Sequence, residues 1–248
     1  MEDGSDKRRR ADLVLVERGF YESRARAQAA IAAGLVRVNG VTLSKPSQTL
    51  ADIADIVAEA EHPYVSRGGV KLAAALDHFL LDPAERFCLD LGASTGGFTD
   101  VLLKRGARHV VALDVGRDQF HLSLRGDRRV TLLEGFDARH LTRDILAEEP
   151  SLIVADVSFI SLTLILPKTL PLALPNAALV VLVKPQFEVG RAALKKGIVR
   201  NELHRREAVD RIITCVTSEG WHVMGVMDSP IAGGDGNQEF LLAAERRS

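Results

Sequence analysis

Apolar and polar residues follow different patterns in the two parts of this chain. Over residues 10–33 the apolar positions recur at helical spacing in two short stretches, and Ser23 is a suitable N-cap for the second. Residues 35–41 have the pattern of a β-hairpin with an Asn-Gly turn. An acidic stretch, residues 52–64, predicts one more short strand and a linker. The first part of the chain is therefore predicted to be a compact α+β unit.

Seven short apolar runs follow, and stretches with helical spacing separate them. This alternation predicts an α/β domain with a mostly parallel, seven-stranded sheet and helices on both faces. We place the domain boundary after residue 62, which gives domains 1–62 and 63–248, and we expect residues 1–8 to be flexible. The seven runs are residues 87–89, 110–113, 130–133, 152–155, 179–183, 222–227 and 239–243.

The most apolar region, residues 157–183, does not predict a membrane span. Lys168 and three prolines interrupt it, so we expect a helix, a proline-rich turn and a buried strand. The amino terminus is charged and has no apolar signal core, which favours a cytoplasmic protein without stable membrane association. Two cysteines, Cys88 and Cys215, lie in a predicted strand and a predicted helix, and they indicate neither a disulfide framework nor a metal site.

A glycine-rich loop, residues 90–99, stands where the first strand of the sheet ends and the next helix begins. Its sequence is Asp-Leu-Gly-Ala-Ser-Thr-Gly-Gly-Phe-Thr. Glycines at such a point let backbone amides approach a ligand closely. The spacing Gly-x-x-x-Gly-Gly differs from the Gly-x-Gly-x-x-Gly fingerprint of dinucleotide sites. A cofactor without phosphates, such as S-adenosylmethionine, therefore fits this loop better than a nicotinamide dinucleotide.

The first unit is strongly basic although the formal net charge of the whole chain is -1. Nine lysines and arginines stand against three acidic residues between Lys7 and Lys45, a local balance of +6. A basic surface of this kind is either a solvated face or a contact surface for RNA, whose folded shape is read largely through phosphate contacts. The residues that we assign to RNA contact under the second interpretation are Arg9, Arg10, Arg24, Arg26, Arg37 and Lys45.

Polar residues that follow the apolar runs are candidates for a ligand site, because ligands bind outside the carboxyl ends of parallel strands. Asp114 comes 22 residues after Gly92, the separation at which a carboxylate accepts hydrogen bonds from a cofactor ribose; alternatively it caps the next helix. Asp137 either faces an adenine amino group or is a turn or cap residue. The residues assigned to cofactor binding are Asp90, Gly92, Ala93, Ser94, Thr95, Gly96, Gly97, Asp114 and Asp137.

Four further charged residues lie at strand ends or in the helix before the first strand. Lys184 follows a continuous apolar run, and an ammonium at such a position needs a partner of opposite charge. Asp156 follows a second apolar run and is a suitable partner. Glu239 begins the last predicted strand, and Lys71 opens the helix that precedes the first. Each residue alone is typical of a surface charge, but together they indicate a site around the glycine loop.

Several segments in a fixed order resemble the TlyA, or hemolysin A, family, whose members join an S4 RNA-binding domain to an FtsJ-like methyltransferase domain. Residues 10–40 are similar to the S4 domain. The resemblance extends over nearly all of the chain, from Arg9 to Ala244. The segments of the second domain that carry it are residues 66–72, 90–99, 155–161, 183–190 and 236–239.

The resemblance implies a Rossmann-like class I methyltransferase fold, S-adenosylmethionine as the cofactor and ribosomal subunits as partners. The implied activity is 2'-O-methylation of a cytidine in the ribosomal RNA of the large subunit. Action on the small subunit as well is left open. The early end of the chain after its last strand favours the large subunit alone. The family's catalytic Lys-Asp-Lys-Glu tetrad falls on Lys71, Asp156, Lys184 and Glu239. We expect Lys184 to deprotonate the ribose 2'-hydroxyl or to stabilise its alkoxide, and Asp156 to hold Lys184.

One segment departs from the family pattern. Residues 62–65 read His-Pro-Tyr-Val where some relatives have Arg-x-Trp-Val, which argues against a linker contribution to cofactor binding. Three other functions compete with the leading one. The loop spacing disfavours a nicotinamide oxidoreductase, and the complete tetrad disfavours an RNA-binding protein without catalysis. The charged amino terminus and the interrupted apolar region disfavour a pore-forming cytolysin.

Overall fold

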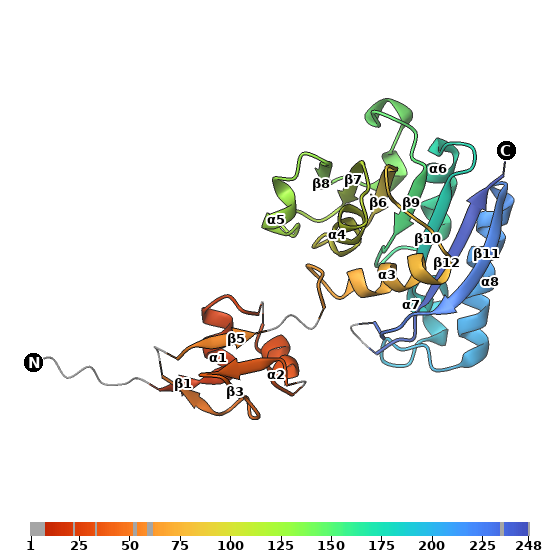
Figure 1. The fold of residues 1–248 in the computed structure, drawn as a ribbon. Coiled ribbons are helices and arrows are strands. Elements are labelled where there is room, and N and C mark those ends of the chain that lie inside the picture. Colours follow the sequence, from red (N-terminus) through yellow and green to blue (C-terminus); the bar gives the residue numbers. More distant parts are fainter. Residues whose placement is uncertain are drawn as a thin grey trace, which may run out of the picture. The chain divides into compact units, whose positions relative to one another are not determined.

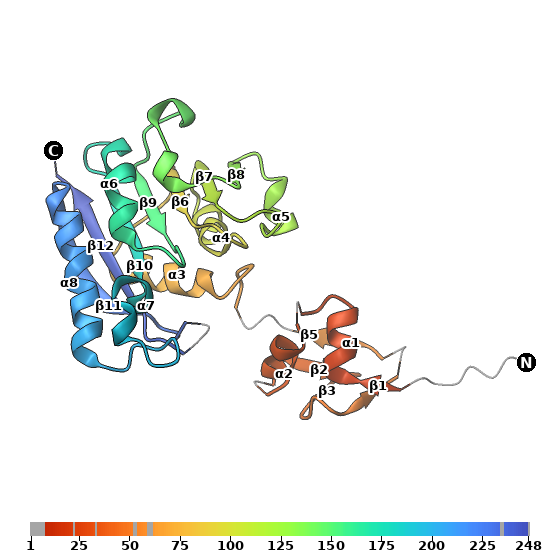
Figure 2. The same ribbon diagram turned by 180° about the vertical axis from the view of Figure 1, so that it is seen from behind.

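The structure is a computed structural model that describes residues 8–21, 23–32, 34–51, 54–58, 62–233 and 236–247. The chain divides into two compact units, Met1–Pro63 and Tyr64–Ser248. Figures 1 and 2 show the elements of each unit from opposite sides. We expected residues 1–8 to be flexible, and of these only Arg8 belongs to the described residues.

The first unit packs two short helices against small antiparallel sheets around one apolar core. The backbone N–H of Arg26 donates to Ser23 Oγ at 3.3 Å, so Ser23 caps the second helix as predicted. The predicted hairpin turn is also present, with positive φ at Asn39 and Gly40. The elements are β1 (Arg9–Arg10), α1 (Ala11–Glu17), α2 (Arg24–Ala32), β2 (Val36–Val38), β3 (Val41–Thr42), β4 (Thr49–Leu50) and β5 (Ile56–Ala58).

Strand pairing in the first unit is only partly visible in the sequence. β2 pairs with β3, as the hairpin pattern predicts, and β5 is the short strand predicted within residues 52–64; its pairing with β2 was not predicted. β1 pairs with β4 in a ladder of two residues each, which no apolar alternation marks. Strands this short carry no recognisable period, so their position could not be predicted.

The second unit is built on a seven-stranded sheet with the order β11-β12-β10-β9-β6-β7-β8. The β10-β9-β6-β7-β8 part is parallel, and β12 runs antiparallel to both of its neighbours. All seven predicted apolar runs are strands of this sheet. They are β6 (Phe87–Leu91), β7 (His109–Asp114), β8 (Val130–Glu134), β9 (Leu152–Ala155), β10 (Ala178–Val183), β11 (Trp221–Asp228) and β12 (Phe240–Arg246).

Helices cover both faces of this sheet (Figures 1 and 2). Successive residues of a strand point to opposite faces of the sheet. Leu89 packs in the core layer that contains Ile212 of α8 (Glu202–Ser218), whereas Cys88 packs in the layer that contains Leu72 of α3 (Gly68–His78). The predicted α/β fold is therefore confirmed. The helices are α3 (Gly68–His78), α4 (Gly97–Lys104), α5 (Leu122–Arg125), α6 (Leu166–Thr169), α7 (Pro185–Glu188) and α8 (Glu202–Ser218), with 3-10 turns at η1 (Ala138–His140), η2 (Arg143–Ile145), η3 (Leu162–Leu164), η4 (Leu170–Leu172) and η5 (Arg191–Ala193).

Two local predictions differ from the structure. The helix expected before β10 is broken into η3, α6 and η4, because Pro167 and Pro171 each lack an N–H and each begin a new turn. Glu239 lies one residue ahead of β12 and not inside it, because the β10-β12 ladder ends at the pair Val183–Phe240. Across the described ranges, every helix is too short or too polar to traverse a lipid bilayer.

Candidate functional site

The four predicted catalytic residues come from four different elements to one edge of the sheet. Asp156 directly follows β9, and Lys184 directly follows β10. Glu239 directly precedes β12, and because β12 is antiparallel its start lies at the same edge as the ends of β9 and β10. Lys71 reaches this edge from the first turns of α3. The sheet topology therefore gathers residues that are up to 168 positions apart in sequence.

These four residues form two adjacent ion pairs. Lys184 Nζ lies 2.6 Å from Asp156 Oδ1 and donates a hydrogen bond to Ser158 Oγ at 2.8 Å. Lys71 is paired with Glu239, and both are nearly buried, at 8% and 3% exposed. The two pairs are neighbours because Lys71 and Asp156 line the same small cavity of about 120 Å³. Their catalytic roles stay predictions.

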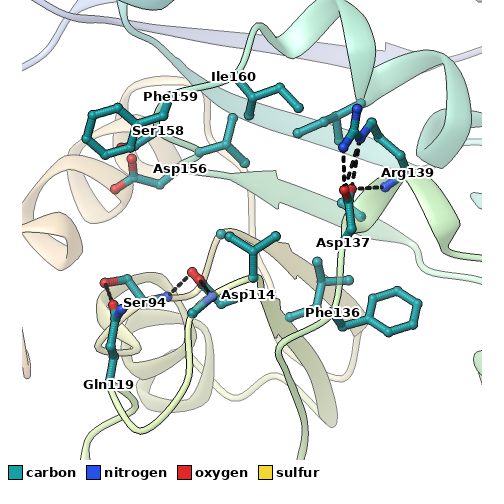
Figure 3. Close-up of a pocket in the computed structure, with 17 residues that line it drawn as sticks. Ser94, Asp114, Gln119, Phe136, Asp137, Arg139, Asp156, Ser158, Phe159 and Ile160 are labelled. Atoms are coloured by element: carbon teal, nitrogen blue, oxygen red, sulfur yellow. Dashed lines mark hydrogen bonds and ion pairs between the residues drawn. The ribbon is translucent and has the colours of Figure 1, made fainter.

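A larger cavity of about 460 Å³ lies on the other side of Asp156 (Figure 3). Its walls include the apolar side chains of Phe136 and Ile160, and the carboxylates of Asp114 and Asp137 face it. Cavities of this size and character hold small organic ligands. The one cation among the residues that line it, Arg139, is paired with Asp137 at 2.6 Å. Its lining therefore suits a nucleoside better than a pyrophosphate.

The glycine loop separates the two cavities and is closely packed. Gly92 has a φ of 81°, and a Cβ there would lie 2.7 Å from the carbonyl oxygen of Asp156. Gly96 has a φ of 91°, and a Cβ there would lie 2.6 Å from Leu124. Any other residue would strain the backbone and collide with these neighbours. Gly92 and Ser94 line both cavities, so loop backbone is available to a ligand in either.

Asp137 has the cap role that the sequence left as an alternative, at the start of η1, whereas Asp114 does not cap the next helix, α5, whose N-cap is His121. Asp114 accepts hydrogen bonds from the backbone N–H groups of Ser94 at 2.8 Å and Gly116 at 2.7 Å. Asp137 accepts one from the backbone N–H of Arg139 at 2.9 Å, and the Arg139 guanidinium lowers the pKa of Asp137 to about 2. Both carboxylates also line the larger cavity, so contacts with a cofactor ribose and adenine stay predictions.

Asp90 does not line either cavity, although we assigned it to cofactor binding. It is fully buried behind the loop, where Thr99 Oγ1 donates to its Oδ2 at 2.6 Å. Burial raises the pKa of Asp90 to about 7, with the Thr99 hydrogen bond acting in the opposite direction. Gly96 also lies outside both linings. The assigned loop residues that do line a cavity are Gly92, Ala93, Ser94, Thr95 and Gly97.

Sequence reasoning missed Ser158 and Phe159, which lie directly after Asp156. Phe159 is 91% exposed, has a φ of 64°, and its ring centroid lies 5.1 Å from that of Phe187. A left-handed backbone and full exposure are both unfavourable for phenylalanine and are typical of functional positions. Apolar periodicity cannot identify such a residue, and the only signal was its position in segment 155–161 of the family resemblance.

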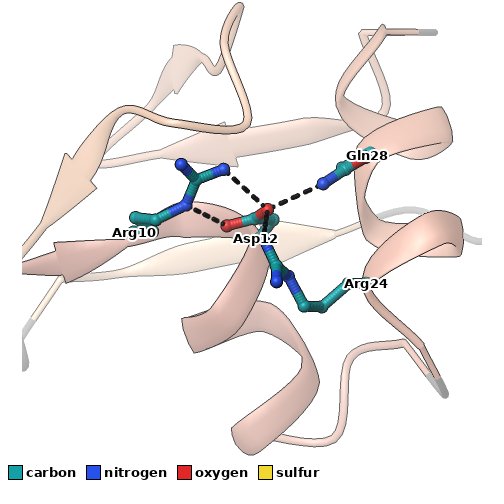
Figure 4. Close-up of polar contacts among 4 residues, drawn as sticks. All are labelled: Arg10, Asp12, Arg24 and Gln28. Atoms are coloured by element: carbon teal, nitrogen blue, oxygen red, sulfur yellow. Dashed lines mark hydrogen bonds and ion pairs between the residues drawn. The ribbon is translucent and has the colours of Figure 1, made fainter.

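In the first unit, a buried carboxylate organises two of the predicted RNA-contact arginines (Figure 4). Asp12 is fully buried and accepts hydrogen bonds from Arg10 at 3.0 Å, from Arg24 at 2.9 Å and from Gln28 at 2.8 Å. The Arg10 guanidinium beside Asp12 holds the pKa of that carboxyl well below its usual range. About half of each arginine side chain stays exposed, so the guanidinium groups of Arg10 and Arg24 are fixed but accessible.

The other predicted RNA-contact residues lie on separate elements of the first unit. Arg9 is paired with Glu17, and Arg26 is half-buried on α2. Arg37 on β2 and Lys45 after β3 are exposed, and neither forms an ion pair with a residue that the structure describes. The structure therefore brings Arg10 and Arg24 together, whereas a role for the others in one surface stays a prediction.

The strand order, the antiparallel β12 and the glycine loop at the end of β6 define the second unit as a class I methyltransferase domain. Residues 64–246 match the FtsJ-like methyltransferase family, and residues 9–55 match the S4 domain. The chain belongs to the TlyA family, in which these two domains are joined. The family resemblance seen in the sequence is thereby confirmed.

Individual relatives cover nearly the whole chain. It is 45% identical over 239 residues to the 16S/23S rRNA (cytidine-2'-O)-methyltransferase TlyA of Mycobacterium tuberculosis, which covers 95% of this chain and 89% of that protein. It is 41% identical to hemolysin A of Brachyspira hyodysenteriae, over 94% of this chain and 98% of that protein. The solved structure of a candidate hemolysin from Streptococcus thermophilus has a TM-score of 0.77 and 39% identity, over 98% of this chain and 90% of that chain.

Proposed function

We propose that the protein transfers a methyl group from S-adenosylmethionine to the ribose 2'-hydroxyl of a cytidine in ribosomal RNA of the large subunit. The observation that carries this proposal is the pair of adjoining ion pairs, Lys184–Asp156 and Lys71–Glu239, beside a nucleoside-sized cavity. The name of the Mycobacterium tuberculosis relative, which describes the same reaction on both subunits, supports it. Action on the small subunit stays open.

The residues around the larger cavity fit S-adenosylmethionine. Bound there, the cofactor supplies an electrophilic methyl group on a sulfonium sulfur. The apolar wall with Phe136 suits a purine ring, and the carboxylates of Asp114 and Asp137 suit ribose hydroxyls and an exocyclic amine. The loop backbone at Gly92 and Ser94 can contact the remainder of the molecule. A dinucleotide fits less well, because the loop spacing Gly-x-x-x-Gly-Gly differs from the fingerprint whose backbone amides bind a pyrophosphate.

Lys184 is the residue best placed to act on the hydroxyl. An ammonium has three hydrogens, and Lys184 donates one of them to Ser158 Oγ while it forms an ion pair with Asp156. A hydrogen that Ser158 does not accept can be donated to the 2'-oxygen, which stabilises the negative charge that develops as the hydroxyl loses its proton to solvent water. In the alternative role, a neutral Lys184 takes up that proton itself.

Lys71 and Glu239 act by fixing the position of the reacting groups. Their buried ion pair ties α3 to the start of β12, and Lys71 shares the smaller cavity with Asp156. A ribose placed there would contact Lys71 and Asp156, which are paired with Glu239 and Lys184 respectively. Reaction rate depends strongly on such positioning, because a hydroxyl held in line with the methyl group reacts without further ordering.

Phe159 gives the target nucleotide a surface outside the cavity. Bases of RNA that leave the stack commonly stack on aromatic side chains of the protein. Phe159 is nearly fully exposed at the rim of the larger cavity and is braced by Phe187. We infer that its ring supports the target base.

The first unit is proposed to hold the ribosomal RNA by its phosphates. Arg10 and Arg24 are fixed by Asp12, so that less side-chain entropy is lost when they bind. Arginine is well suited to this role because its guanidinium can bind a phosphate through two parallel hydrogen bonds.

The experiment that tests the proposal uses labelled S-adenosylmethionine and unmethylated large and small ribosomal subunits, incubated separately with the protein. We expect incorporation of label into RNA of the large subunit. The absence of label in either subunit would refute the proposal. A parallel liposome-leakage assay examines the cytolysin alternative, which leakage without RNA methylation would support.

A further inference from the structure

The segment between α7 and α8 carries positive charge without any acidic residue. Residues 190–201 contain two arginines and two lysines and neither Asp nor Glu. Lys195, Lys196 and Arg200 are exposed, and none of them forms an ion pair with a residue in the described part of the chain. By contrast, the exposed arginines Arg108 and Arg129 of the same unit are paired with the acidic residues Glu148 and Asp127.

These cations are presented by a hairpin with a defined conformation. Lys195 N donates to Ile198 O at 3.0 Å, and Ile198 N donates to Lys195 O at 3.2 Å. The two turn residues, Lys196 and Gly197, have φ values of 54° and 79°, as in a type I' turn. The lysines therefore stand on an ordered turn and not on an irregular coil.

Asn237 ties this hairpin to the catalytic edge. It is 1% exposed, accepts a hydrogen bond from Val199 N at 3.0 Å, and donates one to Gly197 O at 3.0 Å. Its own carbonyl accepts from Gly233 N at 2.9 Å. Gly233 lies against the carboxylate of Glu239, because a Cβ on Gly233 would come within 2.5 Å of Glu239 Oε1. The hairpin is therefore connected to Glu239 through Asn237 and Gly233.

We propose that the hairpin around Lys195 and Lys196, together with Arg200, binds phosphates of the RNA strand that carries the target ribose. The proposal rests on the proposed function and adds an RNA-binding surface on the catalytic unit itself. Exposed lysines without partners are suited to phosphate contact, which supplies affinity without reading sequence. Because Asn237 connects the hairpin to Glu239, the strand is held close to the residues that position the ribose.

The test replaces both lysines by neutral residues in the full-length protein. Lys195→Gln and Lys196→Asn are combined, since asparagine tolerates the left-handed turn conformation. The matched control combines Arg128→Gln and Lys168→Gln, which removes the same charge from exposed cations elsewhere in the unit. Both proteins are compared with the wild type for thermal stability and for S-adenosylmethionine binding, and we expect these to be unchanged.

The decisive readout is binding to unmethylated large ribosomal subunits over a series of salt concentrations. We expect the hairpin variant to bind roughly tenfold more weakly than the control, with the slope of log affinity against log salt reduced by about 1 to 2. Its KM for the subunits should rise while kcat changes little. Equal affinity and slope in the two variants would overturn the proposal. Failure of the wild type to methylate the same subunits would instead overturn the proposed function.

Discussion

Lys184 Nζ lies 2.6 Å from Asp156 Oδ1, although the two residues follow different strands. The contact exists because β9 and β10 are adjacent and parallel, so their carboxyl ends meet at one edge. Ser158 Oγ accepts a hydrogen bond from the same ammonium. A lysine held in this way still has hydrogen to donate to a substrate oxygen, which is the central element of the proposed mechanism.

Replacement of Lys184 should remove catalysis without loss of the fold. For Lys184→Met we expect kcat to fall by roughly 10²- to 10⁴-fold, the range typical of a lost proton-transfer or charge-stabilising group. S-adenosylmethionine binding, measured by calorimetry, should be retained, because Lys184 does not line the larger cavity. Lys168→Met is the matched control. Full methyl transfer by a folded Lys184→Met protein would contradict the assignment.

Lys184→Arg separates the two roles of this lysine. Arginine keeps a positive charge and hydrogen-bond donors but cannot act as a base. If the ammonium stabilises the alkoxide, Lys184→Arg should retain more activity than Lys184→Met. If a neutral lysine takes the proton, the two variants should be equally inactive. Single-turnover rates of the two variants decide between these outcomes.

The Lys71–Glu239 pair should be more important for activity than for stability. Lys71→Met leaves a buried, unpaired carboxylate and should destabilise the protein by about 3 to 5 kcal/mol. The double variant Lys71→Met with Glu239→Leu should regain most of this stability in urea unfolding, because it removes both charges. It should still be inactive. Recovery of activity together with stability would show that the pair has only a structural role.

Asp90 predicts a pH dependence of stability. Burial raises the pKa of Asp90 to about 7 in the folded protein, whereas the unfolded chain ionises near pH 4. The folded state therefore binds the extra proton, so the stabilising contribution present below about pH 4 is lost as the pH rises to about 7. Asp90→Asn removes this dependence. Urea unfolding at about pH 5 and about pH 8 should show a larger loss of stability in the wild type than in the variant; equal losses would contradict the prediction.

Asp12→Asn should weaken RNA binding through Arg10 and Arg24. The substitution keeps the size of the side chain but removes the charge that fixes both guanidinium groups. We expect weaker binding to ribosomal subunits and unchanged S-adenosylmethionine affinity. Gln28→Ala, which removes a neutral donor to Asp12 and leaves both ion pairs, serves as the comparison. If both variants bind the subunits as the wild type does, Asp12 does not organise an RNA-contact surface.

Phe159→Ala should reduce methylation of RNA and leave cofactor binding nearly unchanged. Base–aromatic stacking is worth about 1 to 3 kcal/mol, so a loss of roughly 5- to 150-fold in kcat/KM is expected. Phe159→Tyr keeps the ring and should retain most activity. An alanine variant as active as the tyrosine variant would show that Phe159 does not support the base.

Much of this architecture was predictable because its signals are local or periodic. Buried parallel strands are continuous apolar runs, and the Gly92 to Gly97 loop follows one of them, so both the sheet and the loop were visible in sequence. The pairing of Lys71 with Glu239 depends on the order of the strands in the sheet. Apolar periodicity does not give this order, and only the family resemblance implied it. Asp12 and Phe159 were missed because a buried carboxylate and an exposed phenylalanine contradict the usual pattern of burial. The burial of Asp90 behind the loop was not visible in the sequence, and its assignment to cofactor binding stays a prediction.

The central claim, that this site methylates a ribose hydroxyl of ribosomal RNA, is tested most directly by mass spectrometry of nucleosides. Unmethylated large subunits are incubated with S-adenosylmethionine and either the wild type or Lys184→Met, and their RNA is digested. The account predicts 2'-O-methylcytidine at one position with the wild type and almost none with the variant. A methyl group on a base, or equal 2'-O-methylation by both proteins, would contradict it.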